Sequence, residues 1–438
     1  MAEDVPRLNL ENLTVAFAQA GALAGAETGK DSAQLVELAS QAPVVRLVDA
    51  VLLEAVNRRA SDVHIEAFEQ EMAIRYRIDG RCYQVAQPPK TLALALASRI
   101  KVLANMDVAE SRLPQDGRIL LTVDLPTAPG AAQAGNRQID LRVSTLPTIH
   151  GESIVLRILD KGSLDNTLHQ LGMDPVIQEA IERLIQRPNG LLLVTGPTGA
   201  GKTTTLYACL TKLNRPEVKL ITTEDPVEYD LNGLVQVAVN TKIGLSFSTS
   251  LRAILRHDPD VIMVGEIRDL ETAQTAVQAS LTGHLVFSTL HTNDAPGAVT
   301  RLLDMGVEPF LVTSTVTGVL AQRLIRALCT QCRAPVEATP EELAAMHIMA
   351  DQLTAPLMRA VGCEACQGIG YKGRTGLYEL LVITEAVRLL VIERASVSEL
   401  RIRARAEGMR TLRQDGITKV LAGVTTVEEM IRETQDYE

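Results

Sequence analysis

The sequence has no tryptophan, and its aromatic residues amount to only 3%. Scarce aromatic rings give little support for base stacking, and a net charge of −10 lacks the basic footprint of a nucleic-acid binder. No run approaches the roughly 18 consecutive apolar residues of a membrane-spanning helix. The N-terminus, MAEDVPRLNLENL, lacks the basic flank and apolar core of a signal peptide. We therefore expect a cytoplasmic protein that does not span a membrane and has no nucleic-acid ligand.

The chain has 438 residues, which is too long for a single hydrophobic core. Residues 1–43 are rich in Ala, Gly, Glu and Gln and are expected to form a loosely ordered lead-in that can contain one short helix. Apolar residues in Val44–Arg59 have the spacing of one buried helical face, and the segments that follow alternate with the period of strands. This pattern predicts a small α+β domain over 44–160, followed by a linker over 161–175.

The last part of the chain, 176–438, has the strand–helix alternation that is typical of a parallel α/β sheet. We expect this sheet pattern to stop before a cysteine-bearing excursion over 329–366. Capping boxes at Ser396–Glu399 and Thr426–Glu429 then predict a C-terminal helical region over 379–438. The expected strands are Leu191–Thr195, Lys219–Thr223, Val261–Val264 and Leu285–Thr289.

A glycine-rich loop lies between an apolar strand and a helix in GLLLVTGPTGAGKTTTLYACL. The segment matches G-x-x-x-x-G-K-[ST] in the strand–loop–helix context that this ATP-binding motif requires. Its glycines let main-chain N–H groups surround phosphate oxygens, while Lys202 can bridge the β- and γ-phosphates and the Thr203 hydroxyl can hold Mg²⁺. The predicted ATP-binding residues are Gly196, Pro197, Thr198, Gly199, Ala200, Gly201, Lys202, Thr203 and Thr204.

Acidic residues follow two of the predicted strands. Glu224 and Asp225 come after one strand in LITTEDPVEY, and Glu266 comes after another in DPDVIMVGEIRD. Ligands of open α/β sheets bind at the carboxyl ends of strands, so these carboxylates are expected beside the phosphates. Glu266 is the predicted general base, because it follows its apolar run most closely. Since Gly265 stands where P-loop enzymes usually have an aspartate, positioning of Mg²⁺ is assigned to Glu224 or Asp225; the alternative is that these are solvated strand-end acids.

Two histidines, His284 and His291, bracket a further predicted strand in ASLTGHLVFSTLHTNDA. A histidine beside an apolar run is usually a structural residue, whereas two histidines next to a nucleotide site favour a functional role. We include both as catalytic candidates. Ser288 and Thr289, which lie between them, are candidate sensors of the γ-phosphate.

Four of the six cysteines form two close pairs, C-x₂-C and C-x₂-C. Six cysteines in a cytosolic chain of this size do not indicate a disulfide framework, and four thiolates can complete a tetrahedral zinc site with no open position. A structural Zn²⁺ site is therefore predicted, with a redox pair or a coincidental grouping as the alternatives. Its predicted ligands are Cys329, Cys332, Cys363 and Cys366.

The motif blocks together resemble the secretion ATPase superfamily. TGPTGAGKTTTLY, ITTEDPVEY, LRAILRHDPDVIMVGEIRD and ASLTGHLVFSTLHTNDA are similar to its Walker A, Asp-box, Walker B and His-box blocks. SDVHIEAF, RYRIDG, RLPQDGRI, DLRVSTLPT and HGESIVLRIL resemble the domain that precedes its motor domain. The resemblance runs from about Val44 to the C-terminus and is strongest to the type II secretion ATPases. It implies an α/β fold with a RecA-like P-loop motor domain, a preceding α+β domain, the Cys₄ zinc-binding excursion and the C-terminal helical region.

The resemblance also implies a homo-hexamer in which arginines from both domains clamp ATP. Its partners would be inner-membrane platform and recruiting proteins, which would hold a cytoplasmic motor at the inner membrane, and hydrolysis would power pseudopilus assembly and protein export. An arginine that reaches a γ-phosphate can raise turnover by about 10³–10⁵-fold. By motif match the arginines are Arg142, Arg157, Arg252, Arg256, Arg268 and Arg374.

Some residues depart from the family pattern, and other functions stay open. Ala67 stands where the family usually has proline, PTAPGAAQAG is a long hairpin insertion, and few residues precede Val44 to grip a membrane-anchored partner. A tetracysteine element disfavours pilus retraction, but pilus assembly and DNA transfer or competence remain alternatives. A different class of protein would be a scaffold that binds nucleotide without hydrolysing it. Glu266, His284 and His291 argue against that scaffold, as the acidic balance argues against a zinc-ribbon nucleic-acid module.

Overall fold

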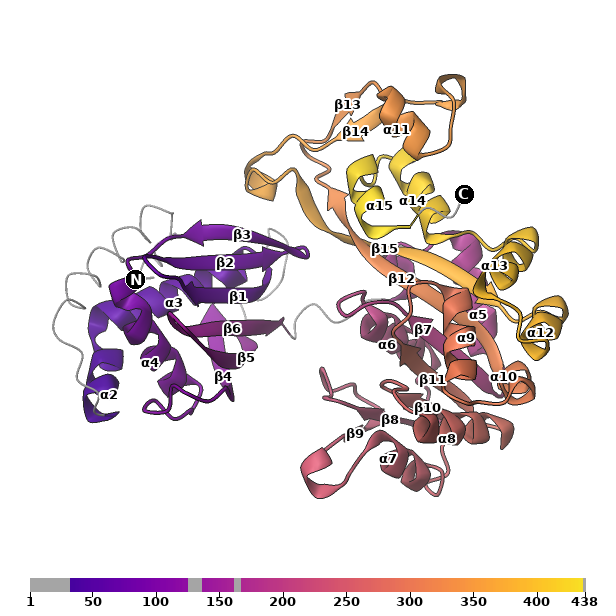
Figure 1. The fold of residues 1–438 in the computed structure, drawn as a ribbon, viewed down its shortest axis with the longest axis horizontal. Helices are drawn as coiled ribbons and strands as arrows, with labels where there is room; N and C mark the ends of the chain where they lie inside the picture. Colours follow the sequence, from indigo (N-terminus) through magenta and orange to yellow (C-terminus); the bar gives the residue numbers. More distant parts are fainter. Residues whose placement is uncertain (1–31, 125–135, 161–166, 436–438) are drawn as a thin grey trace. The chain divides into compact units, whose positions relative to one another are not determined.

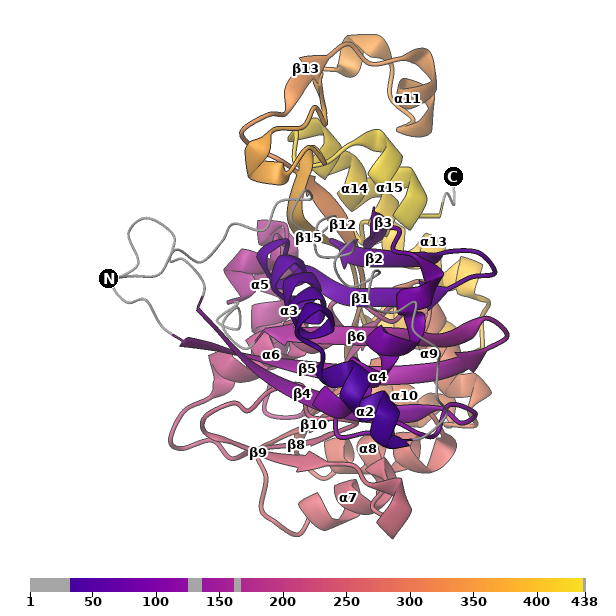
Figure 2. The same ribbon diagram turned by 90° about the vertical axis from the view of Figure 1, so that its left-hand side faces the viewer.

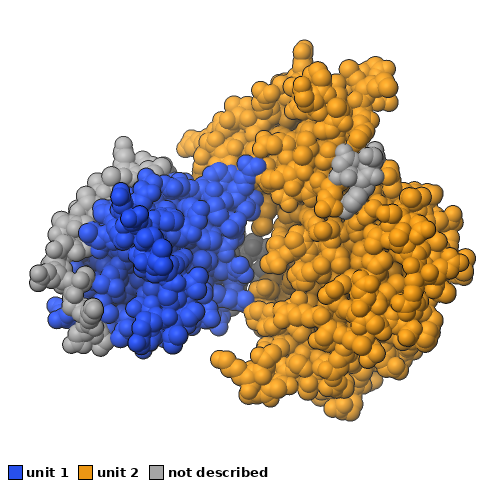
Figure 3. Space-filling model, viewed as in Figure 1, with its two compact units in different colours: residues 1–164 blue, residues 165–438 orange. Residues whose placement is uncertain are grey.

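The computed structural model describes residues 32–124, 136–160 and 167–435. The chain forms two compact units, Met1–Leu164 and Asp165–Glu438, which Figure 3 shows in different colours. The insertion PTAPGAAQAG and most of the predicted lead-in lie outside the described residues. Within the described ranges, no helix has both the length and the apolar character needed to cross a bilayer.

The N-terminal unit is an antiparallel sheet with helices on one face (Figures 1 and 2). The strand order is β3-β2-β1-β6-β5-β4. The strands are β1 (Ala60–Ala67), β2 (Met72–Ile78), β3 (Arg81–Ala86), β4 (Gln115–Asp124), β5 (Asn136–Thr148) and β6 (Gly151–Asp160). The helices are α2 (Ser32–Ser40), α3 (Ala42–Asn57) and α4 (Ala93–Leu103), with a 3-10 turn, η1 (Lys90–Leu92). This arrangement is the predicted α+β domain, although α2 already forms within the stretch that the composition assigned to a lead-in.

The alternation of the N-terminal strands has a simple physical basis. In β2 the apolar Ile74, Tyr76 and Ile78 are buried against the helices, while the intervening Arg75 and Arg77 are only partly buried on the other face. The apolar stripe of α3 supplies the opposing surface. The outward face of the sheet is therefore free to carry charged side chains.

The C-terminal unit contains a seven-stranded sheet in the order β15-β12-β7-β11-β10-β8-β9. Its strands are β7 (Gly190–Thr195), β8 (Leu220–Glu224), β9 (Leu234–Ala238), β10 (Val261–Val264), β11 (Leu285–Leu290), β12 (Val316–Leu328) and β15 (Tyr371–Val382). All neighbouring pairs are parallel except β12 with β15. The four strands that the sequence pattern predicted are present, and the fold is α/β as expected.

Helices cover both faces of this sheet, as a parallel sheet requires. One hydrophobic cluster joins the strands to α5 (Pro175–Ile185), η3 (Leu168–Leu171) and α6 (Lys202–Leu213). A second cluster lies on the other face and includes the first residue of α14 (Leu412–Leu421) and residues of six further helices. These are α7 (Phe247–Ile254), α8 (Leu270–Leu281), α9 (Ala295–Asp304), α10 (Pro309–Thr315), α12 (Glu385–Ile392) and α13 (Val397–Ala406).

The sheet extends further along the chain than the sequence pattern predicted. β12 pairs in parallel with the central strand β7 and antiparallel with β15, which follows the cysteine-bearing segment. The expectation that the sheet pattern ends before 329–366 is therefore wrong, and the predicted helical region 379–438 begins inside β15. The pattern fails here because an antiparallel edge strand that returns after an excursion breaks the strand–helix alternation on which the prediction rested.

The cysteine-bearing segment and the last helices share one small core. The segment contains β13 (Ala334–Val336), β14 (Leu357–Arg359), α11 (Pro340–Ala345), η5 (Ala350–Gln352) and η6 (Glu364–Cys366). It packs against α14 (Leu412–Leu421) and α15 (Val427–Glu433). The buried members of this core are Met346, Leu357, Val420, Val427 and Met430.

The two predicted capping boxes have different outcomes. Ser396 and Glu399 form the full reciprocal box at the start of α13. Thr426 caps α15 as expected, but the Glu429 side chain turns into the core, where it forms an ion pair with Arg326 of β12 at 2.6 Å. This buried pair, with the Arg326 guanidinium 3.8 Å from the centre of the Tyr371 ring, joins α15 to the edge of the sheet.

Candidate active site and metal centre

The glycine-rich loop lies between the central strand β7 and α6, and it packs closely against β12. Gly201 precedes α6 with a φ of 86°, a left-handed conformation that favours glycine. A Cβ at Gly196 would lie 2.4 Å from the Gln322 carbonyl oxygen, and one at Gly201 would lie 2.8 Å from the Gln322 amide nitrogen. The loop thus presents main-chain N–H groups at the start of α6, where anions bind.

The Lys202 side chain is folded over this loop and is only 9% exposed. Its Nζ donates hydrogen bonds to the carbonyl oxygens of Gly196 at 2.7 Å and Pro197 at 3.1 Å. Burial lowers the pKa of the Lys202 ammonium to about 8, although the nearby Glu266 partly opposes this shift. A phosphate anion at the loop would restore the charged form.

Glu266, Arg268 and His291 meet at the carboxyl ends of β10 and β11. Glu266 Oε2 is 3.2 Å from His291 Nε2, and Oε1 accepts a hydrogen bond from Arg268, which raises the pKa of that guanidinium. The other nitrogen of His291, Nδ1, lies 3.5 Å from Lys202 Nζ. Since an ammonium only donates, this geometry fits the tautomer of His291 that carries its proton on Nε2 and donates to Glu266. Asp225 stands at the rim, 3.9 Å from Arg268.

Glu224 has a different environment from Glu266. Its side chain is 3% exposed and accepts hydrogen bonds from Tyr207, from Thr222 at 2.5 Å and from Gln236 at 3.1 Å. Burial and the contact with Glu224 raise the pKa of the Tyr207 phenol. These contacts hold β8 against α6, so Glu224 helps to position the helix that carries Lys202 and Thr203. Of the two acids suggested for Mg²⁺, Asp225 is the more exposed one.

The two candidate histidines lie at opposite ends of β11. His291 follows the strand and belongs to the cluster around Lys202, whereas His284 precedes it. Six residues of strand separate two such positions by roughly 20 Å. His284 Nδ1 lies 2.9 Å from the Ala279 carbonyl oxygen and 3.2 Å from the Thr282 hydroxyl. The fold therefore does not bring His284 to the phosphate site of its own chain, and its predicted catalytic role has no support from this placement.

The neighbouring candidates Ser288 and Thr289 are buried within β11 and bind main-chain oxygens of the adjacent strand. Ser288 Oγ donates to the Val264 carbonyl oxygen at 2.8 Å, and Thr289 Oγ1 donates to that of Gly265 at 2.7 Å. These contacts fix the register of β11 next to β10. They position the ends of the two strands that carry His291 and Glu266.

The segment after His291 is joined to the phosphate loop by a pair of threonines that sequence reasoning missed. Thr195 ends β7, and its Oγ1 accepts a hydrogen bond from the Thr292 main-chain N–H at 2.9 Å. The two hydroxyl oxygens lie 2.8 Å apart. The sequence signal was that the conspicuous histidine is followed by Thr-Asn-Asp, residue types that bind main-chain groups where a strand ends.

The candidate arginines of the C-terminal unit lie in several places. Arg268 contacts Glu266, as described. Arg252 on α7 forms an ion pair with Glu271, and Arg256 donates to the Arg252 carbonyl oxygen at 2.8 Å. Arg374 lies on β15 opposite Arg326 of β12. Among the four, Arg268 contacts Glu266, the acid that follows β10.

Arg157 and Arg142 lie in a row of arginines on the outward face of the N-terminal sheet. In the strand register, Arg157 of β6 lies opposite Arg142 of β5, and Arg142 lies opposite Arg118 of β4. Like charges that oppose each other directly in a sheet are destabilising. Two buried acids offset this: Asp62 Oδ1 lies 3.1 Å from Arg157 Nε, and Asp140 Oδ1 lies 2.6 Å from Arg118 Nε. Such a row can attract an anion.

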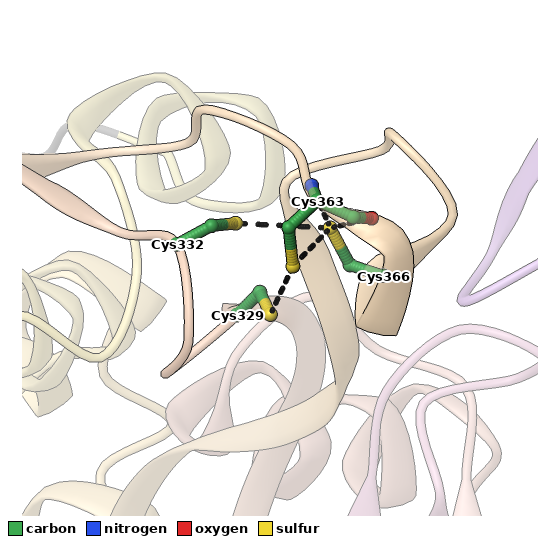
Figure 4. Close-up of side chains that lie close together, drawn as sticks. All are labelled: Cys329, Cys332, Cys363 and Cys366. Atoms are coloured by element: carbon green, nitrogen blue, oxygen red, sulfur yellow. Dashed lines mark hydrogen bonds between the residues drawn. The ribbon is translucent and has the colours of Figure 1, made fainter.

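The four predicted cysteine ligands come together at the end of β12 (Figure 4). The Sγ–Sγ distances are 3.9 Å for Cys329 and Cys363, 3.7 Å for Cys332 and Cys366, and 3.8 Å for Cys363 and Cys366. Disulfide sulfurs would be about 2.05 Å apart, whereas a tetrahedral metal with bonds of about 2.3 Å spaces its sulfurs about 3.8 Å apart. The distances fit four thiolates around one metal ion.

Main-chain N–H groups donate hydrogen bonds to the sulfur of Cys366. The N–H groups of Cys363 and Gly370 lie 3.1 and 3.2 Å from Cys366 Sγ. Burial opposes ionisation of the Cys366 thiol, but these donors together with hydrogen bonds from the Cys332 and Cys363 thiols lower its pKa to about 6. Four sulfur ligands leave no coordination position for substrate, so a metal held by all four cysteines would have a structural role.

Comparisons of the sequence agree with these features. The profile of a family described as type II/IV secretion system protein matches residues 37–432. The chain is 52% identical over 402 residues to the type II secretion system protein HxcR of Pseudomonas aeruginosa, covering 92% of this chain and 80% of that protein. It is 49% identical over 413 residues to the type II secretion system ATPase E of Vibrio cholerae, covering 94% and 79%.

Two solved structures have folds similar to that of this chain. The alignment with the ATPase DotB of Legionella pneumophila covers 88% of this chain and 94% of the DotB chain, with a TM-score of 0.63 and 21% identity. The pilus retraction motor PilT with bound ADP covers 88% and 96%, with a TM-score of 0.57 and 26% identity. The first likeness concerns the fold alone.

Proposed function

The chain belongs to the type II/IV secretion system protein family, and from that premise we propose that it hydrolyses ATP to power pseudopilus assembly and protein export through a type II secretion system. It is a homologue of the type II secretion ATPase E over most of its length. The observation that carries the proposal is the meeting of Lys202, Glu266 and His291 at the carboxyl edge of the sheet.

Each residue of the cluster has a distinct role in this proposal. The glycine-rich loop and Lys202 bind the β- and γ-phosphates of ATP, and Glu266 accepts a proton from the attacking water. His291 holds Glu266 in place through Nε2 while its Nδ1 faces Lys202. Mg²⁺ would neutralise charge that develops on the phosphates; the Thr203 hydroxyl and the Asp225 carboxylate are the groups of this chain suited to hold it.

The assembly and the metal centre are the remaining parts of the proposal. We infer a homo-hexamer in which Arg142 and Arg157 add positive charge at the bound ATP and so couple hydrolysis to movement of the N-terminal unit. Inner-membrane platform and recruiting proteins would keep this motor at the inner membrane. Four thiolates with the spacing of a tetrahedron are suited to Zn²⁺, which we assign to the cysteine centre.

Turnover per subunit is expected to rise with protein concentration, because a site completed by assembly is inactive in the isolated subunit. The measurement is phosphate release across a range of concentrations, with the oligomeric state followed in parallel by light scattering. A Lys202→Ala variant serves as the control for contaminating ATPases and should show no turnover. Turnover per subunit that is flat with concentration and survives in this variant would refute the proposal, and nucleotide binding with no hydrolysis at any concentration would favour the scaffold alternative.

Nucleotide binding is expected to be accompanied by proton uptake at Lys202. With a pKa of about 8, the Lys202 amino group of the nucleotide-free protein is half protonated at pH 8, and a bound phosphate raises that pKa. Uptake should be about half a proton at pH 8 and about a tenth at pH 7. Calorimetry in two buffers with different ionisation enthalpies measures this number. The Lys202→Arg variant is the matched control, because its guanidinium is always charged; equal uptake in this variant would assign the proton to another group.

A further inference from the structure

The connector, defined as residues His291–Ala295, runs from the phosphate site to the C-terminal helices. His291 contacts Glu266 and faces Lys202, as described above. At the far end Asp294 caps α9, with Oδ1 accepting the Gly297 N–H at 2.8 Å. Its other oxygen, Oδ2, accepts a hydrogen bond from Arg401 of α13 at 2.5 Å. Asp294 is 5% exposed, so this ion pair is poorly screened by solvent.

Glu379 of β15 joins the same end of the connector to another helix. It is 1% exposed; Oε1 accepts the Ala295 N–H at 2.8 Å, and Oε2 accepts the Leu412 N–H at 3.3 Å. These two donors are the first residues of α9 and α14. One carboxylate therefore satisfies main-chain donors at two helix N-termini and compensates the positive ends of both dipoles. Burial raises the pKa of Glu379 to about 7, and the charge of Asp294 adds to the effect while Arg401 opposes it.

The middle of the connector has little freedom. Thr292 is held by Thr195 at the base of the phosphate loop. The guanidinium of Arg323 on β12 donates to both the carbonyl and the side-chain oxygen of Asn293, each at 3.2 Å. Thr292 and Asn293 are the two residues between His291 and Asp294, so at most about 11 Å of chain joins the two ends. The position of one end of the connector thus constrains the other.

We propose that Arg401 and Glu379 are positioning residues for His291, and that the connector links the phosphate site to the C-terminal helices α13 and α14. The Arg401 side chain binds the Asp294 carboxylate, and the Glu379 side chain binds the Ala295 main-chain N–H. They act through Asp294 and Ala295, which fix where the chain leaves β11. The kinetic part of this inference rests on the proposed ATPase function, whereas its structural part requires only that nucleotide binds.

The first test compares ATP hydrolysis by Arg401→Gln, Arg401→Lys and a matched control, Arg403→Gln. Misplacing a group at a reaction centre by about 1 Å can cost 10²-fold in rate, so a tenfold or greater fall in kcat is expected for Arg401→Gln. KM for ATP should stay within about twofold, because Lys202 and the loop are unchanged. Arg401→Lys keeps the charge and should recover part of kcat. Arg403 lies on the same helix and pairs with Glu407, so its variant should behave like the wild type.

A second variant, Gly297→Ala, disturbs the Asp294 carboxylate without changing any charge. A Cβ at Gly297 would lie 2.6 Å from Asp294 Oδ1, close enough to displace it. Alanine is otherwise favourable inside a helix, so Gly297→Ala should leave α9 folded. It should lower kcat in the same way as Arg401→Gln. This variant keeps the test decisive if Arg401→Gln does not fold.

Hydrogen exchange then separates the positioning role from general destabilisation. Amides in 396–421 are followed with and without ADP in the full-length protein, together with the Kd for ADP. ADP should slow exchange in this range in the wild type and in Arg403→Gln, and this response should fall at least threefold in Arg401→Gln and Gly297→Ala. The inference is overturned if bound ADP leaves these amides unaffected in the wild type, or if both variants keep the wild-type response or kcat. A wild type that shows the response but hydrolyses no ATP would refute the proposed function and leave the link intact.

Discussion

Replacement of Glu266 by glutamine is expected to lower ATP turnover by about 10²–10⁴-fold, the usual contribution of a general base. Glutamine has nearly the same shape, and its single carbonyl oxygen can still accept one of the two hydrogen bonds that Arg268 and His291 donate to Glu266, but it cannot take up the proton of the attacking water. Nucleotide affinity should change little, because the phosphates are bound by the loop and Lys202. The measurements are kcat from phosphate release and Kd from titration with a fluorescent ADP.

Glu217→Gln provides the matched control for that substitution. Glu217 is an exposed acid in the loop between α6 and β8, and its variant changes the net charge by the same amount. Turnover of this control should equal that of the wild type. If Glu266→Gln retained more than a tenth of wild-type turnover in a preparation that Lys202→Ala inactivates, the base would have to be another group.

Loss of the metal is the change with the largest expected effect on stability. Binding of a structural zinc ion contributes on the order of 10 kcal/mol to folding in small domains. The Cys366→Ser variant removes the sulfur that accepts two main-chain N–H groups, so it should lose metal. Because the cysteine-bearing segment shares its core with α14 and α15, those helices should become exposed to exchange and proteolysis.

Metal content by mass spectrometry and thermal unfolding measure this effect, with Cys82→Ser as the control. Cys82 is an exposed thiol on β3 in the other unit. Its variant should bind one metal ion per chain and melt like the wild type. A Cys366→Ser protein with full metal content and an unchanged melting temperature would show that the centre is not a four-sulfur site.

The sequence was sufficient for the part of the phosphate site that depends on local chemistry. The loop that carries Lys202 must have glycines wherever it approaches β12, so its motif can be recognised within one short segment of the sequence. Glu266 and His291 could be predicted because each follows an apolar run, and parallel strands bring such residues to one edge. His284 precedes its strand, so the same rule places it at the opposite edge of the sheet, and its choice as a catalytic candidate rested only on its position beside the strand.

The remaining contacts depend on pairing between distant segments. Glu224 looks like Glu266 in the sequence, yet its carboxylate is bound by Tyr207 of the neighbouring helix. Glu379 lies in an apolar stretch, and nothing beside it indicates that the starts of α9 and α14 both converge on it. The two partners of Glu379 follow from β15 returning to pair with β12, a step that the alternating pattern does not contain.

The pairing of β12 with β15 also has a consequence for the order in which the chain folds. β12 has its first neighbour, β7, as soon as both have been synthesised, but its outer edge stays open until Tyr371–Val382 has left the ribosome. The four cysteines lie within that interval or at its borders. Pairings between segments distant in sequence form slowly, and an open strand edge is prone to association with other chains. A metal bound by all four cysteines would hold the end of β12 near the start of β15, and would thereby favour early closure of this edge.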